Sequence, residues 1–124
     1  MKANLLIVFI GISLLLHSCR SETSAPCTME YRYITITVTG GLLDDFYTLR
    51  VSTGDTIRYA KNELPGDSVY IVLGDNYQQA LKNSTDTFNF RGLINDSVVV
   101  DEAFVINADE CHIEYISGDT DVSL

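Results

Sequence analysis

The stretch YRYITITVTGG (residues 31–41) decides the fold class. Aliphatic residues at positions 34, 36 and 38 alternate with threonines at positions 35, 37 and 39. A period of two is typical of a β-strand that buries one face and leaves the other polar. The Gly40-Gly41 pair then ends the strand. The stretch therefore predicts one strand of a sheet that covers a core on one side.

Most of the remaining chain consists of similar short segments separated by turn residues. Turn signals lie at 52–54, 64–67, 74–76 and 95–96, and one or two turns of helix are expected over 76–82. Seven or eight short strands without a long helical pattern predict an all-β, antiparallel β-sandwich of Ig-like or transthyretin-like type. After the first strand, the expected strands are Phe46–Val51, Asp55–Tyr59, Val69–Leu73, Thr87–Phe90, Ser97–Val100, Phe104–Ile106 and His112–Ile116.

The chain begins with MKANLLIVFIGISLLLHSC (residues 1–19). Lys2 followed by the apolar run 5–16 is the layout of a secretory signal peptide. As a helix this run would rise about 18 Å, too short to cross the hydrocarbon core of a bilayer. LHSC (residues 16–19) resembles the lipobox of bacterial lipoproteins. The resemblance implies cleavage before Cys19 and acyl chains on it that anchor the protein in the membrane.

Arg20 follows the cysteine. By the same resemblance it implies an outer-membrane lipoprotein of a Gram-negative bacterium, on the periplasmic or the surface face. The expected organisation is a signal peptide over 1–18, a lipidated cysteine and polar tether over 19–26, and one sandwich domain over 27–124.

Lipidation of Cys19 would leave Cys27 and Cys111 as a pair in an oxidising compartment. Such a pair predicts a disulfide that joins the start of the domain to its last strand. The alternatives are a metal pair or a catalytic thiol. A metal site would need more Cys or His nearby, and His112 is the only histidine after residue 18. His112 is adjacent to Cys111, and successive residues of a strand point to opposite faces, so it is poorly placed to activate that thiol.

The ending VVVDEAFVINADECHIEYISGDTDVSL (residues 98–124) resembles that of small bacterial lipoproteins related to carboxypeptidase regulatory-like domains. The resemblance covers Cys27 to Leu124. It implies a non-enzymatic transthyretin-like or Ig-like sandwich in a cell-envelope lipoprotein. That group often has a second cysteine where this chain has Glu110. The matching residues are Val105, Ala108, Asp109, Cys111, His112, Ile113, Ser117, Gly118 and Val122, the last in a final aliphatic strand.

The net charge of −9 argues against binding of nucleic acid, because phosphates would be repelled. No nucleophile elbow, phosphate loop, HExxH or CxxC motif occurs, so we expect no enzyme, no cofactor and no metal. The acidic turns at 44–45 and 75–76 are explained by turn chemistry as well as by calcium. His112 is the one candidate base, and on a strand it would share a face with Glu114. This pair is either a binding or acid–base pair or a structural hydrogen bond.

Tyr31 and Tyr33 share the face opposite the aliphatic residues and are candidates for an exposed binding strip, or for edge packing. Three Asp-Ser/Thr-aliphatic triplets resemble a bacterial O-glycosylation motif and imply Thr56, Ser68 and Ser97 as acceptors, although turn capping explains them too. The sequence thus predicts a lipid-anchored, non-catalytic binding module with a protein, peptide or glycan partner in the envelope. The alternative is an immunity-type or inhibitor lipoprotein that neutralises a basic protein.

Overall fold

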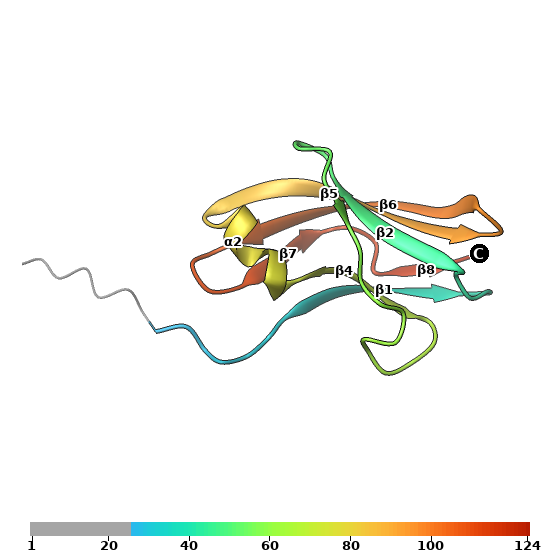
Figure 1. The fold of residues 1–124 in the computed structure, drawn as a ribbon, viewed down its shortest axis with the longest axis horizontal. Helices are drawn as coiled ribbons and strands as arrows, with labels where there is room; N and C mark the ends of the chain where they lie inside the picture. Colours follow the sequence, from blue (N-terminus) through green and yellow to red (C-terminus); the bar gives the residue numbers. More distant parts are fainter. Residues whose placement is uncertain (1–25) are drawn as a thin grey trace, which may run out of the picture.

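The computed structural model describes residues 26–124 as two β-sheets packed face to face (Figure 1). The predicted sandwich is confirmed. The predicted signal peptide, Cys19 and all of the tether before Pro26 lie outside the described residues. The described chain begins at one end of the long axis of the sandwich, and its C-terminus lies at the opposite end (Figure 1).

One sheet has three strands in the order β4-β1-β8, and the other has five in the order β3-β2-β5-β6-β7. A 3₁₀ turn, η1 (Asp75–Tyr77), and one helical turn, α2 (Gln78–Leu81), occupy the predicted helical position. The strands are β1 (Tyr33–Thr39), β2 (Asp45–Arg50), β3 (Thr56–Ile57), β4 (Val69–Gly74), β5 (Ser84–Ile94), β6 (Ser97–Ala108), β7 (Ile113–Ser117) and β8 (Asp121–Ser123).

Strand β1 is the central strand of the small sheet, and it buries alternate side chains as the sequence predicts. Ile34, Ile36 and Val38 are buried, while the residues between them stay partly exposed. β4 pairs with β1 antiparallel along Tyr33–Thr37, whereas β8 pairs with it parallel and only from Thr37 to Thr39. One side of β1 is therefore paired along most of its length, and the other side only at its C-terminal end.

The large sheet departs from the predicted strand lengths. Three short strands were expected over 87–106, but β5 and β6 form one long hairpin closed by Asn95 and Asp96. These two residues have φ of 49° and 62°, the left-handed pair that a tight two-residue hairpin needs. β5 continues through Gly92 instead of ending there, and the register shifts beside it because Val99 of β6 is left without a partner. The strand predicted over 55–59 is also shorter than expected and keeps only Thr56–Ile57.

The core lies between the sheets and is built around aromatic side chains. Phe46 of β2 packs against Tyr70 of β4 and Phe90 of β5, with ring centroids 5.2 and 5.8 Å apart. Thr48, a fully buried polar residue, donates its hydroxyl to the carbonyl of Val72 at 2.7 Å. Val72 has no partner on β1, so this bond satisfies a carbonyl that the ladder leaves free.

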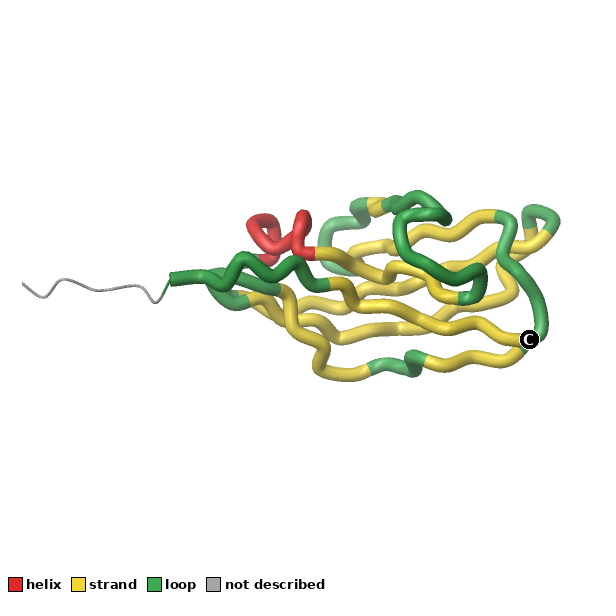
Figure 2. Tube along the Cα trace, turned by 90° about the horizontal axis from the view of Figure 1, so that it is seen from below, coloured by secondary structure: helices red, strands yellow, loops and turns green. Residues whose placement is uncertain are grey.

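The last part of the chain changes from one sheet to the other. β7 pairs with β6 at the edge of the large sheet, and β8 pairs with β1 in the small sheet. Gly118, with φ of 135°, lies in the connection, which runs along one edge of the sandwich (Figure 2). Because this segment joins the small sheet only at Thr37, the first half of β1 has no strand paired with it on that side.

Candidate functional site

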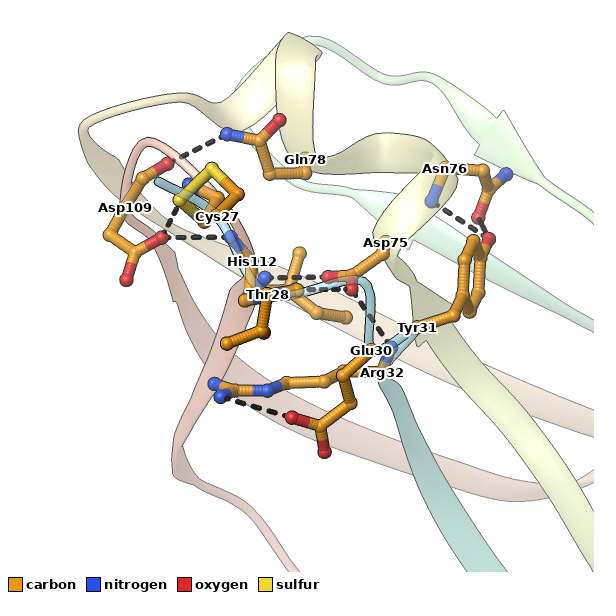
Figure 3. Close-up of polar contacts among 12 residues, drawn as sticks. Cys27, Thr28, Glu30, Tyr31, Arg32, Asp75, Asn76, Gln78, Asp109 and His112 are labelled. Atoms are coloured by element: carbon orange, nitrogen blue, oxygen red, sulfur yellow. Dashed lines mark hydrogen bonds and ion pairs between the residues drawn. A yellow bond between two sulfur atoms is a disulfide. The ribbon is translucent and has the colours of Figure 1, made fainter. Parts of the chain in front are cut away.

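The predicted Cys27–Cys111 disulfide is confirmed. It ties the segment before β1 to the turn before β7, across a sequence separation of 84 residues. Cys111 lies in this turn and not in the last strand, which is β8. The disulfide therefore fixes the start of the domain at the end of the sandwich where η1 also lies (Figure 3).

His112 follows the disulfide and is buried, with 6% of its surface exposed. Its Nδ1 lies 2.7 Å from Oδ2 of Asp75, and its Nε2 lies 2.8 Å from Oγ1 of Thr28 (Figure 3). The predicted pairing with Glu114 is wrong, because His112 precedes β7 and points toward η1. Glu114 is exposed and accepts from the side chain of Asn107 at 3.4 Å.

Asp75 joins three segments that are distant in sequence. Its Oδ2 accepts from the backbone N–H of Arg32 and its Oδ1 from the N–H of Ile113, both at 2.8 Å. Burial by itself would raise the pKa of this carboxyl, but the N–H of Ile113, the ring of His112 and the N–H of Arg32 outweigh it. The pKa of Asp75 therefore lies below its ordinary value.

Asp109 shapes the turn that presents His112. Its Oδ1 accepts from the backbone N–H groups of His112 and Cys111, at 2.8 and 2.7 Å. These two bonds lower the pKa of the Asp109 carboxyl. Gln78 of α2 donates to the carbonyl of Asp109 at 2.8 Å, so the helical turn also holds this loop.

The chain Asp75–His112–Thr28 has the order of a carboxylate, an imidazole and a hydroxyl, as in hydrolase triads. Such chemistry also needs free N–H donors for a developing oxyanion. The backbone N–H groups of Arg32 and Ile113 already donate to Asp75, and those of Cys111 and His112 to Asp109. The arrangement is thus suited to holding the segment before β1 onto the turn before β7.

Tyr31 and Tyr33 lie side by side at the start of β1, with ring centroids 4.9 Å apart. Tyr31 is 50% exposed, and its hydroxyl accepts from the N–H of Asn76 at 2.8 Å and donates to its Oδ1 at 3.0 Å. Tyr59 donates to the same oxygen, and burial raises its pKa to about 12. The two predicted tyrosines therefore form a partly exposed surface that is held in place by hydrogen bonds.

The three candidate O-glycosylation residues lie apart from this site. Thr56 is exposed on β3, and Ser97 is exposed at the start of β6. Ser68 is half-buried just before β4, and its carbonyl accepts from the N–H of Val38 at 2.9 Å. Thr56 and Ser97 are accordingly the more accessible hydroxyls.

Within residues 26–124, no group of three or more His, Cys, Asp or Glu side chains is placed to hold a metal ion. The same range contains no helix long and apolar enough to span a membrane. Comparison with protein-family models, with curated proteins and with solved structures finds no match to this chain. The residue that sequence reasoning missed is Asp75, which it assigned to a turn. Its partners lie 37 to 43 positions away, so no local pattern indicates them.

Proposed function

We propose that the protein is a lipid-anchored, non-catalytic binding module of the bacterial cell envelope. The observation that carries the proposal is the way the start of the domain is fixed. Only seven residues lie between Cys19 and Cys27, and Cys27 is tied to the folded domain by a disulfide. A disulfide is expected in an exported protein, and a short tether on a fixed end suits a domain held at a membrane surface.

The state of His112 supports a non-catalytic role. Its side chain is 7% exposed and both ring nitrogens are engaged, by Asp75 and Thr28. A hydrolase triad has the same two contacts, so the argument rests on the burial of the ring and on the nearby backbone N–H groups. Those N–H groups already donate to Asp75 and Asp109 and are not available to a developing oxyanion. We therefore assign the Asp75–His112–Thr28 chain to the stability of the domain and place binding at its surface.

Metabolic labelling with an alkyne fatty acid, followed by membrane fractionation, tests the anchor. The wild-type protein should be labelled and sediment with membranes, whereas Cys19→Ala should be unlabelled and either soluble or unprocessed. Cys27→Ala is the matched control, because it also removes one cysteine but should keep the label. An unlabelled wild-type protein, or a labelled Cys19→Ala, would disprove the anchor.

Photo-crosslinking in living cells tests the binding role. A photoreactive residue at Tyr31 should give a specific crosslinked partner, while one at Asp101, exposed on β6 of the other sheet, should not. Equal crosslinking from both positions, or none from either, would contradict a binding surface at the start of β1.

Neutralisation of a basic partner is the second candidate function, and the net charge of −9 favours it. It differs from a general binding role in requiring a cationic partner whose activity is inhibited. A crosslinked partner that is basic and loses activity when the protein is added would support this function, and a neutral or acidic partner would exclude it.

A further inference from the structure

The first half of β1 presents an open strand edge. The backbone N–H of Val38 donates to the carbonyl of Ser68, and the carbonyl of Arg32 accepts from the N–H of Asp75. The backbone N–H and C=O groups of the even-numbered residues of β1 therefore point toward β4. The N–H and C=O groups of the odd-numbered residues must point away from β4, because backbone groups alternate in direction along a strand. Thr37 and Thr39 indeed bond to Thr120 and Leu124 on that side. Within residues 26–124, the N–H and C=O groups of Tyr33 and Thr35 have no such partner.

Free space lies beside this edge. Two adjoining hollows of about 450 and 380 Å³ run along it and share Tyr33, Ile34 and Tyr115. β1 forms one wall, and β7 with the start of β8 forms the other. The groove exists because the chain passes from β7 into β8 and reaches β1 only at Thr37.

The other edges of the small sheet offer less backbone to a partner. On β4, the N–H of Gly74 donates to the hydroxyl of Tyr59 at 2.8 Å, and the carbonyl of Val72 accepts from Thr48. β8 is three residues long. Proteins usually cover, shorten or charge their strand edges, because an open edge is a template for another strand. At Tyr33 and Thr35, in contrast, no side chain of the described residues bonds to the outward-pointing backbone groups as Tyr59 and Thr48 do on β4.

The charges along the groove indicate which kind of strand it fits. Glu30, Glu114 and Asp121 line it, and Arg32 is the only basic residue among its lining side chains. Arg32 is itself paired with Glu30, at 3.7 Å. This leaves unpaired negative charge along the groove, in a chain whose net charge is −9. A second copy of the chain would bring the same carboxylates together, whereas a basic segment would be attracted.

We propose that the groove between β1 and β7 binds an extended, basic peptide segment of a partner protein, which adds as a strand to β1 at Tyr33 and Thr35. The backbone of the segment bonds to the free N–H and C=O groups of these two residues, in the position that β8 occupies further along β1. Its cationic side chains lie near Glu114 and Asp121. The inference rests on the proposed binding function and names the site and the chemistry of the partner.

Amide hydrogen exchange of the full-length lipidated protein in detergent micelles tests the proposal. The probe is a seven-residue peptide in which lysine alternates with valine, with both ends blocked. Without peptide, the amides of Tyr33 and Thr35 should exchange faster than those of Ile34 and Ile36, which face β4. A saturating concentration of peptide should slow exchange at Tyr33 and Thr35 at least tenfold.

Two matched peptides separate strand addition from other binding. N-methylation of one alternate set of peptide amides should abolish the protection, and methylation of the other set should preserve it, since only one set faces β1. A glutamate–valine peptide should bind at least tenfold more weakly. Glu114→Lys should weaken binding of the lysine peptide at least tenfold. Asp101→Lys, on β6 of the same sheet but outside the groove, should not.

Three results would overturn the proposal. These are an unchanged exchange rate at Tyr33 and Thr35 with the lysine peptide, equal loss of binding with both methylated peptides, and protection that rises with protein concentration alone. The last result would assign the edge to a second copy. The proposed function fails separately, through an unlabelled Cys19, and peptide protection would stand in that case. Conversely, a lipidated protein whose crosslinks map away from Tyr33 and Thr35 would overturn this site alone.

Discussion

Removal of the Cys27–Cys111 disulfide should cost a large part of the stability of the domain. The bridge closes a loop of 84 residues, and closing a loop of this length in the unfolded chain removes about 15 cal/mol/K of entropy. At room temperature this corresponds to about 4.5 kcal/mol, against a total of about 5–15 kcal/mol for a typical domain. Cys27→Ala, Cys111→Ala and the double variant should all lose the same amount, because each removes the same bridge.

Urea unfolding followed by far-UV circular dichroism and tyrosine fluorescence measures the loss, since the chain has seven Tyr and no Trp. The midpoint should fall by about 2.3–4.5 M if the slope is about 1–2 kcal/mol/M. All variants should carry Cys19→Ala, so that no third thiol can exchange with the bridge. Losses that add in the double variant, or a midpoint that moves by less than about 0.5 M, would refute the reasoning. The second result would mean that 26–32 frays locally while the sheets stay folded.

Three further predictions follow from single residues. Asp75→Ala should lower the free energy of unfolding by about 2–4 kcal/mol, because the N–H groups of Arg32 and Ile113 lose their acceptors. Asp75→Asn should lower it by less. The urea midpoints of the two variants measure both losses. Because the pKa of Asp75 is lower in the folded protein than in the unfolded chain, its ionised carboxylate stabilises the fold above about pH 4, and this stabilisation is lost as the pH falls below that. In Asp75→Asn, the free energy of unfolding should therefore fall less steeply toward acidic pH. Gly118→Ala should lower the melting temperature more than Gly54→Ala. Both glycines have positive φ, but a Cβ at position 118 would lie 2.6 Å from the ring of Phe104. Equal shifts in melting temperature would contradict this prediction.

The parts of the fold that the sequence predicts are those with a local signal. Alternation over 34–39 defines β1 and its buried face, and the run Val69–Leu73 gives β4 to within one residue. The disulfide follows from counting cysteines once Cys19 is set aside. Each of these inferences needs only the pattern of neighbouring residues or a count of the cysteines.

The parts that the sequence does not predict depend on distant partners. Gly92 and the polar residues near it look like breaks, yet β5 and β6 continue through them because each is paired along its length with the other. His112 has acidic neighbours in sequence, but its partner is Asp75, brought to it by the packing of η1. The change of sheet between β7 and β8 has no local signal other than Gly118.

An anchor at Cys19, as we propose, would restrict which partners can use the β1 edge. Cys27 lies eight positions after Cys19, and an extended chain spans about 3.3–3.6 Å per residue, so the tether reaches about 28 Å at most. The disulfide and Asp75 fix that tether to the end of the sandwich where the groove begins, at Glu30 and Ile113. In the proposed arrangement, the partner strand is therefore met close to the bilayer. A basic segment is itself attracted to an anionic membrane surface, and the acidic groove competes with that surface for the segment.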